Sequence, residues 1–339
     1  MEAGGPFPEV VLSSRIRLAR NVDGLPFPQR MTEADAGKLL RSVEAGVKEI
    51  NLVGLSSNVH LYRLAETAPL ERQVLVDKHL ISPQQAQQAK GGAVAVSDDE
   101  AISIMVNEED HLRIQCLAPG LQLTETWRLA SLVDDALEQK LTYAFHGQRG
   151  YLTACPTNLG TGLRASVMMH LPGLVLTQQA GRLFHSLSQL GLVVRGLFGE
   201  GTEAAGNIFQ ISNQTSLGKT EEEIVQHLDA VARKVIQAEK QARQLLHSES
   251  RIQIEDRVGR AYGLLSSARI MTSEEAMRLL SDVRLGIDLD VLPNLNLRLM
   301  NELMVAMQPA FLQKVEGREL DAADRDIRRA AMIRSRLTA

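Results

Sequence analysis

Apolar and polar positions along residues 93–117 follow the pattern of β-strands. Three short segments, Ala93–Ser97, Ala101–Val106 and His111–Leu117, are rich in apolar side chains and are separated by tight polar turns. Antiparallel strands can be joined by such short turns, whereas parallel strands need long crossover connections. We therefore predict an antiparallel meander in this part of the chain.

The same kind of pattern predicts further elements on either side of the meander. Helical spacing begins at Thr32, and a capping box at Thr220 opens a long helix that extends to about His247. The other strands expected are Val10–Leu12 with the residues after it, Leu55–Leu64, Arg72–Val76, Leu192–Arg195 and Asn207–Ser212; the helices are Thr32–Ile50, Ser82–Ala89, Thr124–Lys140 and Leu174–Leu190.

The pattern changes after His247. Glycine becomes rare, strand patterns stop, and helical spacing continues to Leu337, with helix starts expected at Thr272 or Ser273, at Pro293 and at Asp321. A chain of 339 residues exceeds the usual size of one hydrophobic core. We expect an α+β domain over residues 1–247 and an all-helical domain over residues 248–339.

Composition narrows the functional classes. The chain is 44% hydrophobic and 23% charged, and its net charge of −4 gives the whole molecule no signature of direct nucleic-acid binding. The two cysteines form no disulfide framework, no apolar run is long enough to span a bilayer, and the N-terminus has no signal-peptide features. A cytoplasmic protein without membrane attachment is expected.

An acidic triplet stands directly after one of the predicted strands. In the sequence VNEEDHLR, Val106–Arg113, three acids follow an apolar run and precede His111 and Arg113. A strand that delivers carboxylates beside an arginine suggests the edge of a site, because acids are rarely buried without a reason. The alternative is a solvated turn of mixed charge.

Several segments offer donors for phosphate groups. Arg15 and Arg17 lie on the same side of an extended segment, next to Ser13 and Ser14, although a basic edge strand would look similar. Arg164 follows a Gly-Thr-Gly segment that lacks the lysine of a P-loop and the spacing of a dinucleotide motif. The glycine-rich segment 195–206 is of a length that is more often functional than idle.

These motifs, taken together and in order, resemble those of the phosphagen kinases, the creatine and arginine kinases. The resemblance covers about residues 10–247 and rests on the segments SSRIRLARN, DKHL, NEEDHLR, CPTNLGTGLRASV and RG…GE…T…IFQISN. It implies a glutamine-synthetase-like catalytic domain, with a large antiparallel sheet flanked by helices. Phosphagen kinases carry a helical domain before the SSR motif, whereas here that motif begins at Ser13 and about ninety helical residues follow the catalytic part. This arrangement resembles the McsB family of bacterial protein arginine kinases.

The resemblance implies an ATP site with Mg²⁺ carried by the nucleotide. The residues expected there are Ser13, Ser14, Arg15, Ile16, Arg17, His79, Arg113, Arg164, Ala165, Ser166, Val167, Met168, Arg195, Gly196, Leu197, Phe198, Gly199 and Glu200. Met168 and Gln210 differ from the histidine and aspartate of creatine kinases, which suggests altered contacts with adenosine.

The resemblance also assigns catalytic roles. Glu109 matches the catalytic glutamate, Glu200 matches the second glutamate of the arginine kinases, and Cys155 matches the reactive cysteine beside the guanidino group. A guanidinium must lose a proton before it can attack phosphorus, and two carboxylates can orient it and accept that proton. An orienting or tuning role, not a covalent one, is expected for Cys155.

The last segment carries a motif of its own. Arg325, Asp326, Arg329 and Ala330 match the RDxxRA motif, which in the protein arginine kinases forms a regulatory pocket for phosphoarginine; a solvated amphipathic helix is the simpler reading. The implied partners are substrate proteins with exposed arginines, a heat-shock repressor, a zinc-binding activator and a Clp unfoldase, with a homodimer or larger assembly. An adaptor that only reads phosphoarginine and a kinase for free arginine remain as alternatives.

Overall fold

An eight-stranded sheet forms the centre of the computed structural model, which describes residues 4–55, 57–196 and 204–337. The strand order is β2-β3-β4-β5-β1-β8-β10-β9, and every neighbouring pair is antiparallel. The predicted meander is confirmed as β3-β4-β5. The strands are β1 (Val11–Arg20), β2 (Val59–Arg63), β3 (Ala93–Ser97), β4 (Ile102–Val106), β5 (Leu112–Pro119), β8 (Leu163–His170), β9 (Leu192–Gly196) and β10 (Ile208–Asn213).

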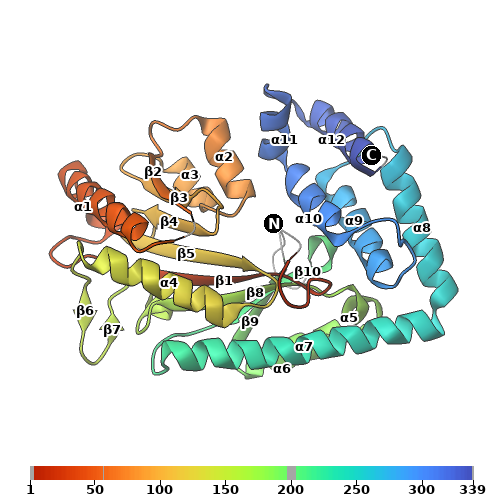
Figure 1. The fold of residues 1–339 in the computed structure, drawn as a ribbon, viewed down its shortest axis with the longest axis horizontal. Helices are drawn as coiled ribbons and strands as arrows, with labels where there is room; N and C mark the ends of the chain where they lie inside the picture. The colour runs from red at the N-terminus through yellow and green to blue at the C-terminus, as the bar shows by residue number, and fades with distance from the viewer. Residues whose placement is uncertain (1–3, 56, 197–203, 338–339) are drawn as a thin grey trace.

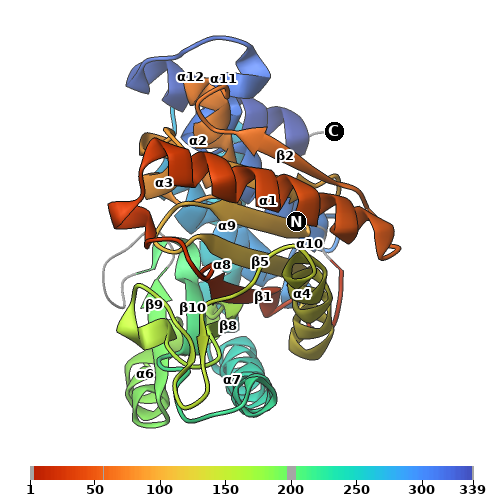
Figure 2. The same cartoon turned by 90° about the vertical axis from the view of Figure 1, so that its left-hand side faces the viewer.

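One face of this sheet forms the main hydrophobic core. Ile16 and Leu18 of β1 lie beside Ile114 of β5 and Val167 of β8 on this face, and all four are at most 1% exposed. Three amphipathic helices contribute to this core: α1 (Glu33–Leu52), α4 (Leu123–Glu138) and α7 (Glu221–Glu249) (Figures 1 and 2). The capping boxes at Thr32 and Thr220 begin α1 and α7, which confirms both predicted helix starts.

The opposite face is covered at its two ends by different helices. Over β3 and β4 it packs against α2 (Pro69–Asp77) and α3 (Pro83–Gln87) in a small apolar cluster that includes Leu80 and Met105. Over β8 and β10, Met168 and Ile208 join a core built mainly from the C-terminal helices. The middle of this face carries polar and charged side chains, and the candidate site lies there.

The C-terminal segment is helical in its described part, as predicted, and packs on the sheet instead of standing apart (Figure 1). Its helices are α8 (Arg251–Ser267), α9 (Ser273–Asp288), α10 (Leu297–Ala306), α11 (Pro309–Glu316) and α12 (Ala322–Leu337). Contacts between α11 and α2 also join it to the helices that cover the other end of the same face. The predicted domain boundary at 247/248 stays a prediction; α7 and α8 meet at Ser250.

Three predicted elements were wrong. Arg72–Val76 belongs to helix α2, because Pro69 favours a helix start and Val74 is the one residue of this helix that is fully buried. The predicted helix Leu174–Leu190 is two helices, α5 (Pro172–Leu176) and α6 (Ala180–Gln189), interrupted where Gln178 has a φ of 59°. No helix starts at Pro293, since α10 begins after an Asn296 cap and α11 at Pro309.

Smaller elements complete the described chain. They are the strands β6 (Phe145–His146) and β7 (Gly150–Tyr151) and the 3₁₀ turns η1 (Pro28–Arg30), η2 (Pro156–Asn158) and η3 (Ala205–Asn207). None of the helices in the described ranges is both long and apolar enough to cross a membrane.

Candidate active site

The strand register places five arginines on one face of the sheet. Directly paired residues of antiparallel strands point to the same side, and Arg17 of β1 pairs with Arg164 of β8. Arg113 of β5 pairs with Ala19, two residues along β1 from Arg17, and Arg195 of β9 pairs with Gln210 of β10. Gln210 in turn accepts a hydrogen bond of 2.5 Å from Nη2 of Arg15. We call this group, Arg15, Arg17, Arg113, Arg164 and Arg195, the arginine cluster.

The arginine cluster is a site of strong like-charge repulsion. Burial, followed by the charges of Arg113 and Arg164, lowers the pKa of Arg15 to about 10. Burial and then Arg15, Arg113, Arg164 and Arg195 lower the pKa of Arg17 well below its ordinary value. The Nε atom of Arg17 is buried and has no hydrogen-bond partner among the described residues. A buried donor without a partner, surrounded by other cations, fits a bound polyanion.

The acidic triplet borders the arginine cluster. Nη2 of Arg113 lies 2.8 Å from a carboxylate oxygen of Glu108 and 2.9 Å from one of Glu109. The Glu108 carboxylate is 6% exposed and also accepts a hydrogen bond from the Ser82 hydroxyl, whereas the Glu109 carboxylate is 37% exposed. Glu109 is therefore the more accessible of the two for an incoming group.

Asp110, the third acid, fixes the backbone just before Cys155. It is buried and accepts hydrogen bonds from the Asn21 amide at 2.6 Å and from the backbone N–H of Ala154 at 2.7 Å. Sequence reasoning missed this role for Asp110 and Asn21. The run of three consecutive acids was the available signal, but the partners of Asp110 are 44 and 89 residues away in the chain.

Cys155 lies close to the same centre. Its Sγ atom is 3.0 Å from the hydroxyl of Thr157. Burial, then the charge of Arg195, lowers the pKa of Arg164, while electrostatic interactions with Cys155 and Glu109 act in the opposite direction. Arg164 is thus near enough to both groups to interact with them electrostatically, and the predicted cysteine, glutamate and arginines come together in space.

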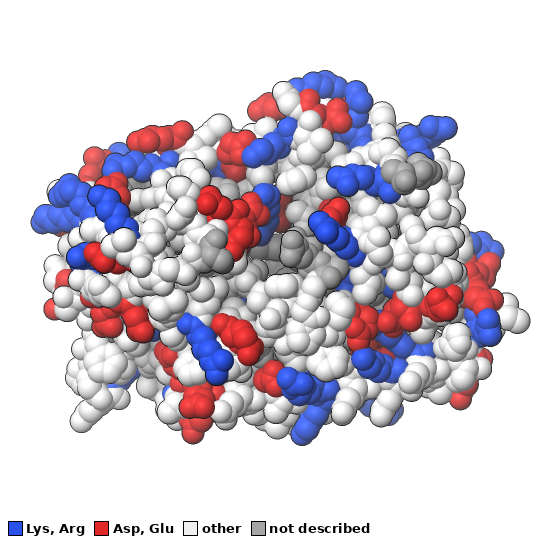
Figure 3. Space-filling view, in the orientation of Figure 1, with Lys and Arg blue, Asp and Glu red and all other residues white. Residues whose placement is uncertain are grey.

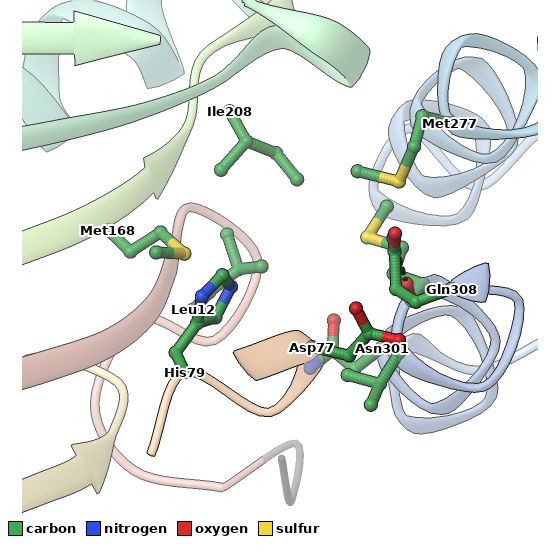
Figure 4. Close-up of a pocket in the computed structure, with 10 residues that line it drawn as sticks. Leu12, Asp77, His79, Met168, Ile208, Met277, Asn301 and Gln308 are labelled. Atoms are coloured by element: carbon green, nitrogen blue, oxygen red, sulfur yellow. Dashed lines mark hydrogen bonds between the residues drawn. The ribbon is translucent and has the colours of Figure 1, made fainter. Parts of the chain in front are cut away.

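His79 lies at the other end of the arginine cluster, after helix α2. Burial, followed by the charge of Arg15, lowers its pKa to about 4, so the imidazole is neutral at pH 7. Its backbone has a φ of 60°, and its carbonyl oxygen accepts a hydrogen bond from Gln115. Strained conformations of this kind are found often at functional sites. Met168 lies beside His79 at a cavity (Figure 4).

Some of the predicted nucleotide-site side chains face elsewhere. Ser13 and Ser166 share the face of the arginine cluster, and Gly196 ends β9 next to Arg195. By contrast, Ile16, Ala165 and Val167 are buried in the core on the opposite face, and the Ser14 hydroxyl bonds to the Gly120 carbonyl. Leu197, Phe198, Gly199 and Glu200 lie outside the described residues.

The RDxxRA residues lie on α12, and some of their side chains are already bonded within the fold. Arg329 is buried and donates to the carbonyls of Met307 and Met271 and to the carboxylate of Asp326. Arg325 donates to the carbonyl of Leu320, and Ala330 is buried. Arg329 therefore holds the helix ends around the motif together, while Asp326 keeps an accessible carboxylate.

Outside the candidate site we considered the surface charge and the groups that could bind a metal ion. Acidic and basic side chains are interspersed over the face drawn in Figure 3, so the arginine cluster is a local feature. No group of three or more His, Cys, Asp or Glu residues within the described ranges could hold a metal ion.

Two family models match the chain. The catalytic domain of the ATP:guanido phosphotransferases matches residues 42–242, and the C-terminal domain of the protein-arginine kinase McsB matches residues 251–339. The chain is 71% identical over 339 residues to the protein-arginine kinase of Symbiobacterium thermophilum, covering 100% of this chain and 96% of that one. The chain belongs to the protein-arginine kinase family. The Bacillus subtilis protein-arginine kinase is 52% identical over 337 residues, covering 99% of this chain and 92% of that one.

Solved structures agree with this family assignment. Lombricine kinase superposes with a TM-score of 0.60 at 28% identity, covering 72% of this chain and 69% of that one. A duplicated taurocyamine kinase from Schistosoma mansoni, solved with bound transition-state analog components, gives 0.60 at 27% identity over 71% of this chain and 34% of that one. The predicted family and the large antiparallel sheet with flanking helices are confirmed, and the chain is a kinase of the guanido type.

Proposed function

We propose that this protein arginine kinase transfers the γ-phosphoryl group of ATP to arginine side chains of proteins. The observation that supports this most directly is the junction between two kinds of group at Arg113. On one side of it lie the other four arginines of the arginine cluster, and on the other lies the accessible carboxylate of Glu109. A polyphosphate and a guanidinium can meet only where cations and anions adjoin in this way.

The arginine cluster would hold the phosphate chain of ATP. Phosphoryl transfer is catalysed mainly by positioning and electrostatic stabilisation, and planar guanidinium groups bind phosphate oxygens in pairs. Mg²⁺ would enter bound to the nucleotide and would neutralise part of the phosphate charge. The like-charge repulsion within the arginine cluster would be relieved when the polyanion binds.

Glu109 would prepare the acceptor. An arginine guanidinium is protonated at neutral pH, so one proton must leave before a nitrogen lone pair can attack the γ-phosphorus. The carboxylate accepts that proton as the new N–P bond forms, the bond from the γ-phosphorus to the β,γ-bridging oxygen breaks, and ADP departs. Glu200 would act as the second carboxylate, and Cys155 would orient the guanidino group without forming a bond to phosphorus.

The wider role follows from the family resemblance. Phosphoarginine on a client would mark it for a Clp protease, with a heat-shock repressor as one client and a zinc-binding protein as activator, in a cytoplasmic stress response. Autophosphorylated arginines would dock at Arg325 and Asp326 of a neighbouring subunit and promote assembly. If Arg325→Ala and Asp326→Ala leave oligomer size and activity unaltered, this regulatory proposal fails.

One experiment tests the proposed activity directly. The full chain is incubated with MgATP and a basic model protein, and peptides are analysed by mass spectrometry under non-acidic conditions. Phosphoarginine on the model protein is expected. A protein that only reads phosphoarginine would transfer nothing, and a kinase for free arginine would phosphorylate the amino acid faster than the protein.

A further inference from the structure

The chain that follows β1 lies beside the acidic triplet. Strand β1 ends where β5 begins, because Arg20 pairs with Leu112, so the residues after β1 and the acids before β5 lie at the same end of the sheet (Figure 1). Nε2 of Gln29 donates a 2.9 Å hydrogen bond to the backbone carbonyl oxygen of Glu109. The residue with the accessible carboxylate is therefore in direct contact with the segment that leads to α1.

His111 fixes this segment at two points. Its Nδ1 atom accepts a 2.9 Å hydrogen bond from the backbone N–H of Val22, so the proton of the neutral ring is on Nε2. Nε2 lies 2.8 Å from the carbonyl oxygen of Pro26 and donates to it. Because His111 directly follows the acidic triplet, one turn of the chain positions both the carboxylates and the segment beside them.

Prolines stiffen the part of the segment that lies nearest to Glu109. We call residues 26–30 the proline loop, since it contains Pro26 and Pro28. A proline fixes its own φ and favours an extended residue before it, and Phe27, between the two prolines, has a φ of −54° and a ψ of 152°. The Phe27 side chain is 39% exposed, and aromatic residues are enriched where proteins bind one another. The proline loop is thus a fixed, extended edge with an accessible aromatic ring.

A target arginine brings its own main chain close to this edge. The guanidinium stands at the end of three methylene groups, so the backbone and the flanking side chains of a substrate lie only a few bonds from the carboxylate that receives the guanidinium. Oε1 of Gln29 has no hydrogen-bond partner among the described residues and can accept from a backbone N–H. The ring of Phe27 offers an apolar contact to a flanking side chain.

We propose that the proline loop binds the polypeptide that carries the target arginine. Phe27 packs against an apolar side chain next to that arginine, and Gln29 accepts a hydrogen bond from the substrate backbone. The substrate class is then an extended segment in which an apolar residue flanks the arginine. His111 is a positioning residue, which fixes the proline loop without touching the substrate. This inference rests on the proposed function, because it assumes that Glu109 receives an arginine of a protein.

The first test exchanges both partners of the proposed contact. Two carrier proteins end in an extended tail with a single arginine, which is flanked on both sides by leucine in one tail and by serine in the other. Steady-state kinetics with the full chain compare the wild type, Phe27→Ala and the control Leu190→Ala, whose side chain is 51% exposed at the end of α6. The wild type should have a KM about three- to tenfold lower for the leucine tail, and Phe27→Ala should lose this preference.

The control variant should keep the preference, and the KM of MgATP should be the same in all three proteins. A wild type without the preference, or a Phe27→Ala variant that keeps it, overturns the assignment. So does a wild type that phosphorylates a basic protein but neither tail, because the proline loop would then accept no extended segment. In these cases phosphoarginine formation by the wild type leaves the proposed function standing. A wild type that phosphorylates no protein contradicts the proposed function itself.

Gln29→Ala gives a different signature. A hydrogen bond to the substrate backbone does not depend on the flanking side chains, so this variant should raise the KM of both tails by the same factor, about threefold or more. The control is Gln226→Ala on α7, where Nε2 also donates a 2.9 Å hydrogen bond to a glutamate, in this case the Glu222 side chain. Equal KM values for Gln29→Ala and the wild type would contradict the proposed backbone contact.

His111 needs a test that separates positioning from folding. His111→Phe keeps a ring but removes both hydrogen bonds, so it should lose the preference for the leucine tail while the KM of MgATP stays the same. His111→Asn retains an acceptor for the N–H of Val22 and should recover part of the preference. If His111→Phe keeps the full preference, His111 does not position the proline loop.

A photocrosslink tests the contact without kinetics. Phe27→p-benzoylphenylalanine should crosslink to the leucine tail, and an excess of free tail peptide should reduce the yield. The same replacement at Leu190 should give no crosslink to the tail. Crosslinks from position 27 only to a second copy of the kinase would assign the ring to an interface between copies and overturn the proposal, and so would the absence of any crosslink to the tail.

Discussion

Strand β1 carries two kinds of arginine, one on each face of the sheet. Arg20 shares the apolar face with Leu18, but its guanidinium lies 2.7 Å from the Asp134 carboxylate and over the ring of Tyr151. Burial is the largest single effect and opposes its charge, but Asp134, Tyr151 and Glu221 together outweigh burial and raise the pKa of Arg20. Arg17, three residues earlier, faces four other cations, and its pKa is lowered.

This difference separates structural from functional arginines. The charge of Arg20 is balanced within the fold, so the fold loses stability when it is removed. Among the described residues that contact Arg17, no acid balances its charge. Keeping this charge in the fold lowers stability, and a bound polyanion would balance it. Unbalanced charge in a partly open site is a feature of functional sites. The following predictions test this distinction, starting with the largest expected effect.

Glu109→Gln should lower kcat for phosphoarginine formation by roughly 10²- to 10⁴-fold, because it removes the proton acceptor. Unfolding in urea should show little change, since the Glu109 side chain is 37% exposed and its pair with Arg113 contributes little to stability. Glu100→Gln, on the β3–β4 turn, is the control and should keep full activity. Equal kcat values for Glu109→Gln and the wild type would refute the assignment.

Arg20→Met should reverse this pattern. Removing one partner of a buried ion pair leaves Asp134 uncompensated, and we expect a loss of about 3–5 kcal/mol in the free energy of unfolding. Adding Asp134→Leu should recover much of this loss. The folded fraction should keep its Kd for ATP, because Arg20 points away from the arginine cluster. Urea unfolding and calorimetry measure the two quantities.

The sequence was most informative where local pattern decides structure. The antiparallel meander, the capped helices at Thr32 and Thr220, and the shared side of Arg15 and Arg17 could all be predicted from neighbouring residues. The helix at Arg72–Val76 could not, because only Val74 of α2 is fully buried, and Asp77 at the end of α2 accepts a hydrogen bond from the backbone of Ala310 in α11, 233 residues away.

The motifs that form the site could be predicted from the sequence, but their arrangement in space could not. The bond from Asp110 to the backbone of Ala154 joins two motifs that the sequence separates by 44 residues.

The pH dependence of stability tests the environment of His79 beside the arginine cluster. An unfolded histidine has a pKa of about 6.5, while the folded value is about 4. Between these values the unfolded chain binds a proton that the folded chain does not, so stability is full above about pH 6.5 and is lost as the pH falls toward 4. The difference in unfolding free energy between the wild type and His79→Gln should therefore shrink by about 2 kcal/mol over that window, allowing for partial exposure of the ring.

A constant difference across this window would mean that neither burial nor the charge of Arg15 disfavours protonation of His79 in the folded chain. The comparison with His79→Gln is needed because burial also lowers the pKa values of His111 and His170, which contribute to the pH dependence of both proteins alike.

Arg17→Met has a small expected effect on stability, and the sign of that effect distinguishes the two kinds of arginine most sharply. Removing a partly buried charge that only like charges surround should raise the free energy of unfolding by about 1 kcal/mol. The same variant should weaken ATP binding by roughly tenfold or more, because a charge-assisted hydrogen bond to phosphate is lost. A loss of stability comparable to that of Arg20→Met would show that Arg17 is balanced within the fold after all. The expected result is a gain in stability together with weaker binding of both ATP and inorganic tripolyphosphate. That result would show that Arg17 lowers the stability of the fold and is needed for binding the ligand.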